Sequence, residues 1–268
     1  MAELVFLKLG GSLITDKLRY ETPRPAVIER LAKEIRAALD AKPEMQLVLG
    51  HGSGSYGHFA ADRYHVHKGH LEDWRGYAET GAAAQRLNRL VVDTMLAHGV
   101  PVVSVQPSAS AQSHQGELVG MALDPIAGLL ERGLVPLVYG DVVLDTGQGC
   151  AIVSTEQIFA FLAQAFRPQR IILSGEVAGV YSGDPQRDTI VRLIPEISSR
   201  NYEQVERVLT SSFGVDVTGG MLTKVQSLYA LVQEQPNLVV RIITGRRGHL
   251  LERVLVDPSL AEGTLVRY

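Results

Sequence analysis

The sequence predicts an α/β fold in which an open, mainly parallel sheet is sandwiched by helices. Short β-rich runs alternate with longer segments whose apolar residues recur at helical spacing. The strand runs are continuously apolar, which is typical of parallel strands covered by helices on both faces. Glycines cluster directly after several of these runs, and open sheets of this kind bind ligands beyond the carboxyl ends of their strands.

The first strand is predicted at residues 4–9, where it ends in Gly10-Gly11. The first helix opens near Pro25, because proline suits the first helical turn and the apolar residues that follow repeat on one helical face. The chain shows no linker and no internal repeat, so we expect a single domain, 1–268, with a boundary between two functional halves at residues 139–150. Further strands are predicted at residues 46–49, 102–105, 135–139, 142–144, 171–173 and 238–243, and further helices at 74–98, 123–132, 155–166 and 219–233.

Composition excludes several classes of protein. With 46% hydrophobic residues and a net charge of −3, the chain is neither disordered nor basic enough to favour nucleic acid or membrane surfaces. Its single cysteine, Cys150, allows no internal disulfide and favours a reducing compartment. No run approaches the roughly 18 apolar residues of a membrane span, and residues 1–9 lack a secretory pattern. We therefore expect a cytoplasmic protein.

Two glycine-rich segments follow the first two strands. Lys8-Leu9-Gly10-Gly11-Ser12 combines close backbone approach with a positive charge, as a phosphate site requires, although a strand followed by two glycines is also an ordinary tight turn. Residues 50–58 read as a loop containing G-x-G-x-x-G, which suggests a dinucleotide fold. Because residues 64–70 are polar and show no second strand, we prefer a phosphate-cradling loop that ends at His58.

Other polar segments have weaker signals. His65, His67 and His70 fit no standard zinc spacing and indicate a solvated loop or the start of a helix. Gly140 opens a strand and turn that carries Asp141 and Asp145, and it reads equally well as part of a hairpin.

Two segments of the second half suit a nucleotide. Residues 174–185 follow a strand and are rich in small residues and turn formers, which suits a pocket for a base and ribose. Residues 216–224 place Gly219-Gly220 before a helix with Lys224 in its first turns, and a helix N-terminus with a lysine suits phosphate. No P-loop is present, so a nucleotide would be bound in another way.

Taken in order, these segments resemble the amino acid kinase family, whose members transfer the γ-phosphoryl group of ATP to a carboxylate or a phosphate. The resemblance runs from Lys8 to Lys224 and implies an αβα sandwich with an acceptor-binding half (about 1–145) and a nucleotide-binding half (about 146–268). Within the family, residues 54–58 together with Lys17 are similar to isopentenyl phosphate kinases, and fosfomycin kinases share the histidine at His58.

The resemblance implies roles for individual residues. Lys17 and Lys224 would stabilise the transferring group, and His58 would bind the acceptor phosphate. It further implies ATP and Mg²⁺ as cofactors and isopentenyl phosphate or a similar small phosphate as acceptor. A homodimer is expected because it is the commonest oligomer. The nucleotide would contact Lys8, Gly10, Gly11, Ser12, Gly54, Ser174, Gly175, Tyr181, Gly220 and Lys224, and the acceptor would contact Ser53, Gly54, His58 and Gly140.

The chain departs from the family pattern at two positions. Ser53 stands where archaeal relatives have a glycine. Ser154-Thr155-Glu156-Gln157 stands where relatives commonly read Ser-Gly-Asp-Asp, so the acid that orients the lysines would be Glu156, one methylene longer than aspartate.

Several functions stay open on the sequence alone. The leading hypothesis is phosphorylation of isopentenyl phosphate to the diphosphate for isoprenoid synthesis. A phosphonate kinase of the fosfomycin type and a carboxylate kinase such as acetylglutamate kinase are the alternatives within the family. A catalytically silent nucleotide-sensing module is the alternative outside catalysis, and the retained lysines Lys8, Lys17 and Lys224 argue against it.

Overall fold

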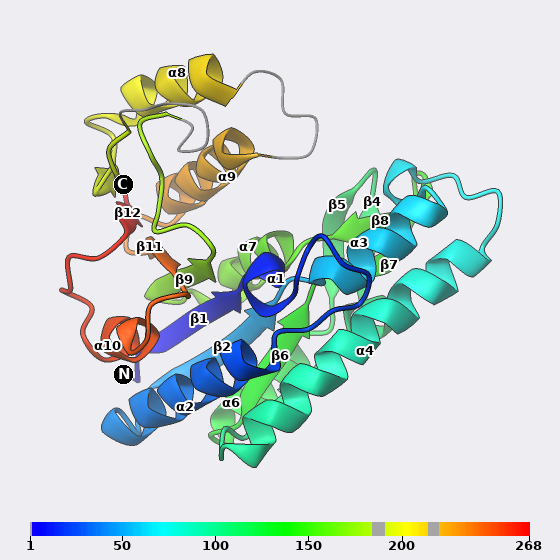
Figure 1. The fold of residues 1–268 in the computed structure, drawn as a ribbon, viewed down its shortest axis with the longest axis horizontal. Coiled ribbons are helices and arrows are strands. Elements are labelled where there is room, and N and C mark those ends of the chain that lie inside the picture. Colours follow the sequence, from blue (N-terminus) through cyan, green and yellow to red (C-terminus); the bar gives the residue numbers. More distant parts are fainter. Residues whose placement is uncertain (1, 184–190, 214–219) are drawn as a thin grey trace.

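In the computed structural model, residues 2–183, 191–213 and 220–268 are described, and they contain a central sheet of eight strands. The order is β10-β12-β11-β9-β1-β2-β6-β3, and every neighbouring pair is parallel except β11 with β12 (Figure 1). The predicted α/β fold with a mainly parallel sheet is confirmed. The strands are β1 (Leu4–Leu9), β2 (Gln46–His51), β3 (Val102–Ser104), β6 (Val135–Tyr139), β9 (Arg170–Gly175), β10 (Glu196–Ile197), β11 (Val239–Thr244) and β12 (Thr264–Val266).

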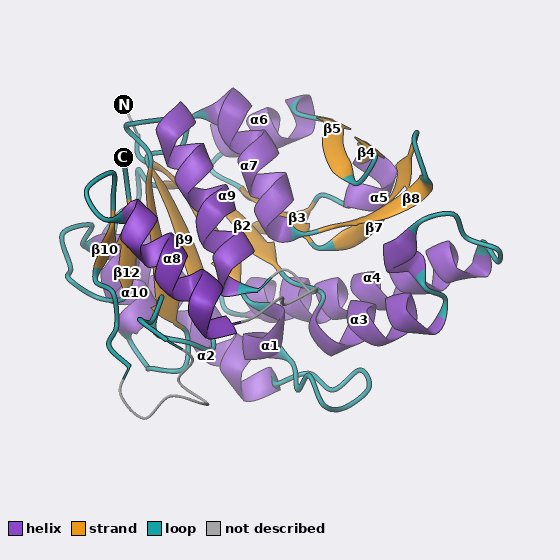
Figure 2. Ribbon diagram, turned by 90° about the horizontal axis from the view of Figure 1, so that it is seen from above, coloured by secondary structure: helices purple, strands orange, loops and turns teal. Residues whose placement is uncertain are grey.

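Helices cover both faces of this sheet, as Figure 2 shows. Successive side chains of a strand point to opposite faces, so Leu7 belongs to one buried cluster and Phe6 to the other. The first face carries α1 (Gly11–Ile14), α2 (Pro25–Ala41), α4 (Arg75–Ala97) and α10 (Leu250–Val256), and the second carries α6 (Asp124–Glu131), α7 (Thr155–Phe166), α8 (Tyr202–Phe213) and α9 (Met221–Glu234).

A second sheet of four strands lies beside α3 (Gly54–Arg63) and α4, at the right of Figure 1. It consists of β4 (Ala111–His114), β5 (Glu117–Met121), β7 (Asp141–Asp145) and β8 (Gly149–Val153), preceded by α5 (Pro107–Ser110). The sequence predicted only part of β7, because the other strands are at most five residues long and β4 is mostly polar.

The two carboxylates of the Gly140 segment have structural partners in this sheet. Asp145 closes its turns by accepting hydrogen bonds from the Ser113 hydroxyl (2.8 Å) and the Gly116 backbone N–H (2.8 Å), among others. Asp141 is buried and accepts from the backbone N–H groups of Ser108 (3.1 Å) and Val142 (2.9 Å). Burial raises the pKa of Asp141 to about 6.

The predicted loop over residues 50–57 is wrong. Strand β2 continues to His51 and α3 begins at Gly54, so His58 lies in the second turn of a helix rather than at the end of a loop. The connection is this short because Gly52 and Gly54 allow it to pack directly on the turn after β1.

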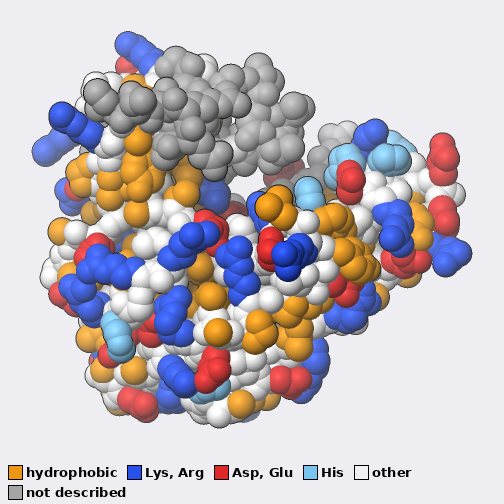
Figure 3. All heavy atoms as spheres, viewed as in Figure 1, with side chains coloured by type: hydrophobic (Ala, Val, Ile, Leu, Met, Phe, Trp, Pro, Cys, Tyr) orange, Lys and Arg blue, Asp and Glu red, His pale blue; other side chains and the backbone are white. Residues whose placement is uncertain are grey.

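The histidine-rich segment that follows contains a short 3₁₀ helix, η1 (Val66–Lys68), with His65 and His70 in left-handed backbone conformations. In the described part of the chain, no three His, Cys, Asp or Glu residues lie close enough together to hold a metal ion. Across the same residues, no helix has the length and apolar character needed to cross a bilayer. Figure 3 shows basic and acidic side chains interspersed over the face that it displays.

Candidate active site

The glycine-rich turns predicted from the sequence meet at the carboxyl edge of the parallel strands. The backbone N–H of Gly10 donates to Ser174 O at the end of β9 (2.7 Å), and that of Gly140 donates to His51 O at the end of β2 (3.0 Å). Gly245, directly after β11, donates to Gly175 O (2.7 Å). Segments far apart in the sequence therefore form one continuous rim.

Two of these turns fit against each other without room for a side chain. A Cβ atom on Gly11 would lie 2.5 Å from the backbone nitrogen of Gly54. Gly54 itself has a φ of +52°, a left-handed conformation that favours glycine, and a Cβ there would collide with the Thr15 hydroxyl. The turn after β1 and the start of α3 are therefore held at a fixed separation by glycine packing.

Lys8, Glu156 and Lys224 form a charged cluster above this rim. The Nζ atom of Lys8 lies 2.5 Å from Oε1 of Glu156, and that of Lys224 lies 3.4 Å from the same oxygen. The side chain of Lys8 is 12% exposed, so this lysine of an apolar strand is compensated by a carboxylate rather than by water. Glu156 thus occupies the place that the resemblance gave to the lysine-orienting acid.

The local sequence of α7 places Glu156. Ser154 and Gln157 form a capping box, in which the Ser154 hydroxyl accepts from Gln157 N (3.1 Å) and the Gln157 side chain accepts from Ser154 N (2.8 Å). Thr155, in the first turn, donates its hydroxyl hydrogen to His51 O (2.7 Å). These three contacts fix the first turn of α7 against the end of β2.

The charges of this cluster shift one another's pKa. Burial alone would raise the pKa of Glu156, but Lys8 and Lys224 lower it to about 2. Burial lowers the pKa of Lys8, the charges of Lys224 and Lys17 lower it further, and Glu156 opposes the shift. The cluster therefore holds one carboxylate between two lysines, and an anion entering it would find excess positive charge.

Lys17 and His58 are exposed and lie on two segments that are bound to each other. Lys17 belongs to the loop that follows α1, and His58 belongs to α3. The backbone N–H of Ser55 donates to the Thr15 hydroxyl (3.0 Å), and Thr22 N donates to the Ser55 hydroxyl (3.2 Å). The loop is also attached to α4, since Arg86 forms an ion pair with Glu21.

The segments predicted to contact the nucleoside lie beside β9. Ser174 ends the buried part of β9, and its hydroxyl oxygen is buried with no hydrogen-bond partner among the described residues. Tyr181 forms an isolated antiparallel bridge with Leu193, and Gly220 lies at the N-cap position of α9. Asp184, Pro185 and residues 216–219 of the two predicted motifs lie outside the described residues.

His51 is a buried polar residue of this region that the sequence did not single out. Its ring stacks on Tyr139 (centroids 5.4 Å apart), its Nδ1 lies 3.1 Å from Gly52 O, and its Nε2 lies 3.2 Å from Asn88 Nδ2. The Asn88 carbonyl oxygen accepts in turn from the Ser104 hydroxyl (2.7 Å). Burial lowers the pKa of His51 to about 4, so the ring is neutral at physiological pH.

This shifted pKa predicts a specific loss of stability in acid. The unfolded chain binds a proton at His51 near pH 6.5, whereas the folded chain binds it only near pH 4. Relative to a His51→Gln variant, the wild-type free energy of unfolding should therefore decrease by about 3 kcal/mol as the pH falls from 7 to 4. Urea unfolding at several pH values measures the difference in free energy of unfolding between the two proteins. Asp141 has the opposite pH dependence, but its contribution cancels because both proteins contain it. A difference independent of pH would show that His51 titrates normally.

Comparison with known proteins identifies the family. The model of the amino acid kinase family matches residues 3–243. The chain belongs to the amino acid kinase family. Among its relatives in this family, the isopentenyl phosphate kinase of Methanothermobacter thermautotrophicus is 37% identical over 243 residues, covering 86% of this chain and 88% of that protein.

Solved structures of family members agree with this assignment. One described as isopentenyl phosphate kinase superposes with a TM-score of 0.82 at 31% identity, covering 98% of this chain and 100% of that one. A substrate complex of isopentenyl phosphate kinase superposes with a TM-score of 0.76 at 26% identity, covering 99% of this chain and 100% of that one. The family resemblance predicted from the motifs is confirmed.

Proposed function

We propose that this chain is an ATP-dependent kinase that phosphorylates isopentenyl phosphate to isopentenyl diphosphate, a step of isoprenoid synthesis. The observation that carries the proposal is the cluster of Lys8, Glu156 and Lys224 at the carboxyl edge of the sheet. It supplies positive charge where phosphate groups would meet, in a chain whose relatives of 37% and 32% identity are isopentenyl phosphate kinases.

The reaction follows from charge. An oxygen of the acceptor phosphate forms a bond to the γ-phosphorus of ATP, the bond from that phosphorus to the β-γ bridging oxygen breaks, and ADP leaves. An acceptor phosphate has a second pKa of roughly 6, so it is already an anionic nucleophile and requires no general base. The main obstacle is repulsion between the two phosphates, which Lys8, Lys17 and Lys224 would reduce while holding the reactants in line.

The remaining predicted roles complete the proposal. Gly10, Gly11 and Ser12 would hold the ATP phosphates, and Ser174, Gly175 and Tyr181 would contact the nucleoside. Gly54 would approach the nucleotide phosphates. It would also contact the acceptor, together with Ser53, His58 and Gly140. ATP would then lie mainly on residues 146–268 and the acceptor on residues 1–145. Glu156 would orient Lys8 and Lys224 rather than exchange a proton with substrate.

We also propose Mg²⁺, a homodimer and the cytoplasm as the setting of the reaction. Magnesium in phosphoryl-transfer sites is held by few carboxylates together with the nucleotide phosphates. Glu156, the carboxylate of the lysine cluster, is already paired with two lysines. The ion would therefore be carried by the phosphates of ATP, where it offsets their charge. The mass of the purified protein by light scattering tests the homodimer.

Release of ADP from ATP tests the proposed function directly. Isopentenyl phosphate, fosfomycin and N-acetylglutamate are offered separately, and isopentenyl phosphate should give the highest kcat/KM. A preference for fosfomycin or N-acetylglutamate would contradict the acceptor assignment. ATP binding without ADP release in the presence of any acceptor would instead support the sensing module.

The acceptor should carry an apolar tail. Ala60 and Ala61 are buried in the core, but Phe59 is half-buried and contacts the ring of Tyr20 from the loop of Lys17 (centroids 5.8 Å apart). Burial of each methylene contributes about 0.8 kcal/mol, so kcat/KM for isopentenyl phosphate should exceed that for 2-hydroxyethyl phosphate by about tenfold or more. Equal values for the two phosphates would reject an isoprenoid pocket.

His58→Ala should reduce kcat/KM for the acceptor by about 10- to 150-fold, because a hydrogen bond to a charged group contributes about 1.5–3 kcal/mol. The KM for ATP should change little, since His58 lies on α3 and not beside β9. His58→Asn should retain part of the activity because an amide also donates. His67→Ala, another exposed histidine, is the matched control. Parental kinetics in His58→Ala would refute the acceptor role.

A further inference from the structure

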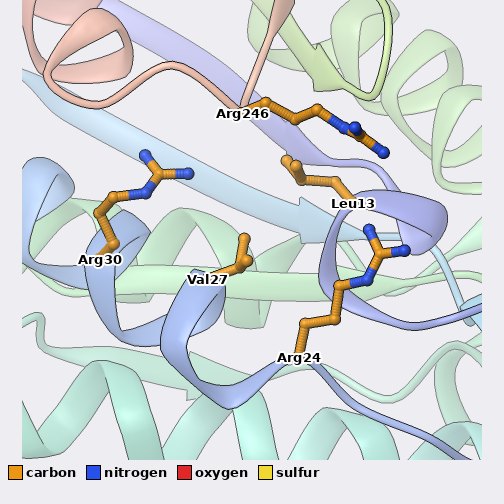
Figure 4. Close-up of a pocket in the computed structure, with 5 residues that line it drawn as sticks. All are labelled: Leu13, Arg24, Val27, Arg30 and Arg246. Carbon is orange, nitrogen blue, oxygen red and sulfur yellow. The ribbon is translucent and has the colours of Figure 1, made fainter.

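A recess of about 360 Å³ lies on the face of the sheet that carries α2, and arginines dominate its lining. It is bounded by Leu13 of α1, by Arg24, Val27 and Arg30 at the start of α2, and by Arg246 after β11 (Figure 4). Leu13 belongs to the buried cluster of this face, whereas α7, which carries Glu156, packs in the cluster on the opposite face. The recess and the lysine cluster therefore lie toward opposite faces of the sheet.

The charges around the recess do not balance. Arg24 and Arg246 share one carboxylate, Glu176, with Arg24 Nη1 at 2.7 Å from its Oε1. Arg30 pairs with Glu34 (2.5 Å), whose other oxygen already accepts from Leu251 N (3.0 Å). Three guanidinium groups thus face two carboxylates, and both carboxylates are engaged.

Unused donors remain on two of these arginines, Arg24 and Arg246, whereas Arg30 donates through one Nη atom to Glu34 and through the other to Gly245 O. Arg24 donates only through Nη1, to Glu176 and to Ser12 O (3.1 Å), and Arg246 donates through Nη2. Among the described residues, no protein atom accepts from their remaining guanidinium N–H groups. A guanidinium presents its N–H groups as a planar fork that matches the oxygens of a phosphate. The five residues that line the recess include no carboxylate.

We propose that this recess is a second anion-binding site, which takes a soluble phosphate or diphosphate ester. The three arginines offer more N–H donors than the two oxygens of a carboxylate ligand could accept. A diphosphate has more oxygens and would contact guanidinium groups from both the start of α2 and the segment after β11. Leu13 and Val27 give the recess an apolar wall, which fits an ester with a small organic substituent. The proposal does not depend on which acceptor the kinase phosphorylates.

A pair of isosteric substitutions tests the site without removing any arginine. Val27 is half-buried in the first turn of α2 and lines the recess. Val27→Glu places a carboxylate among the arginines, whereas Val27→Gln places a neutral side chain of the same size there. Both variants are titrated calorimetrically with inorganic diphosphate, which also binds at the catalytic lysines of both. The Val27→Gln isotherm should contain one more binding site, which Val27→Glu lacks or binds at least tenfold more weakly.

A second substitution tests the site independently if the Val27→Glu variant does not fold. Arg30→Met removes one guanidinium and should weaken the same binding event, while Arg132→Met, which removes an exposed arginine from the end of α6, should not. Identical isotherms for Val27→Glu and Val27→Gln, or an Arg30→Met isotherm equal to that of Arg132→Met, would overturn the proposal. An unmutated protein that binds the additional diphosphate but releases no ADP from ATP with any acceptor would overturn the proposed function and leave this site standing.

Discussion

Lys224→Ala should leave a folded protein whose kcat is about 10²–10³-fold lower, the loss expected when one donor to a developing charge is removed. Lys224 lies in the first turns of α9, so its ammonium group and the positive end of the helix dipole would act on the same phosphate. The substitution also leaves Glu156 paired with Lys8 alone, at 2.5 Å. Steady-state kinetics with circular dichroism measure the outcome.

The comparison requires two controls. Lys68→Ala removes an exposed lysine from η1 and should leave kcat unchanged. Lys224→Arg keeps the charge but changes its shape, so it should retain more activity than alanine does. A folded Lys224→Ala protein with near-normal kcat would refute the role of this lysine in the transition state.

Glu156→Gln should lower kcat by about 10²-fold or more, although Glu156 would touch neither substrate. Its carboxylate holds Lys8 at 2.5 Å and Lys224 at 3.4 Å, and the amide has no charge with which to hold them. Removing one member of a partly buried ion pair is unfavourable because the remaining charge loses its partner. The two lysines would then repel each other and lose their orientation toward the phosphates.

The pH profile distinguishes this orienting role from a purely structural one. Glu156 raises the pKa of Lys8 against the effect of burial, so its removal lowers that pKa further. Lys8 would then lose its proton at lower pH, and the alkaline decline of kcat should move to lower pH in Glu156→Gln. Glu156→Asp keeps the charge and should restore the wild-type profile. An unchanged profile in Glu156→Gln would show that the carboxylate does not control the charge of Lys8.

The sequence predicted six of the eight strands of the central sheet because they are apolar runs covered by helices, whereas the short strands β10 and β12 were not predicted. β1 and β6 were placed residue by residue, since their runs are continuously apolar and end at glycines. Polar strands such as β4 give no such signal, because their pairing depends on the turn around Asp145. The helix start at Gly54 was missed for a similar reason: it depends on packing against Gly11, which is remote in sequence.

The candidate site was only partly predictable. Motifs and family resemblance brought Lys8, Lys224 and Glu156 to attention, and the structure places them in contact, while their roles stay predictions. The arginines of the recess have no sequence signal, because Arg24 and Arg246 come from opposite ends of the chain and each is unremarkable locally. His51 was overlooked because its partners, Asn88 and Tyr139, lie on a helix and a strand that no motif connects to it.

The glycine contact between Gly11 and Gly54 fixes the start of α3, and it would let the choice of acceptor change in evolution independently of phosphoryl transfer. Any side chain at either position would displace the start of α3 from the turn after β1, and with it His58 from the lysines. The contact involves only the first residue of α3, so positions farther along α3 or on α4 lie outside it. In the proposed kinase, a change of acceptor would therefore come from the outer parts of these helices, and the position of His58 relative to the lysines would stay the same.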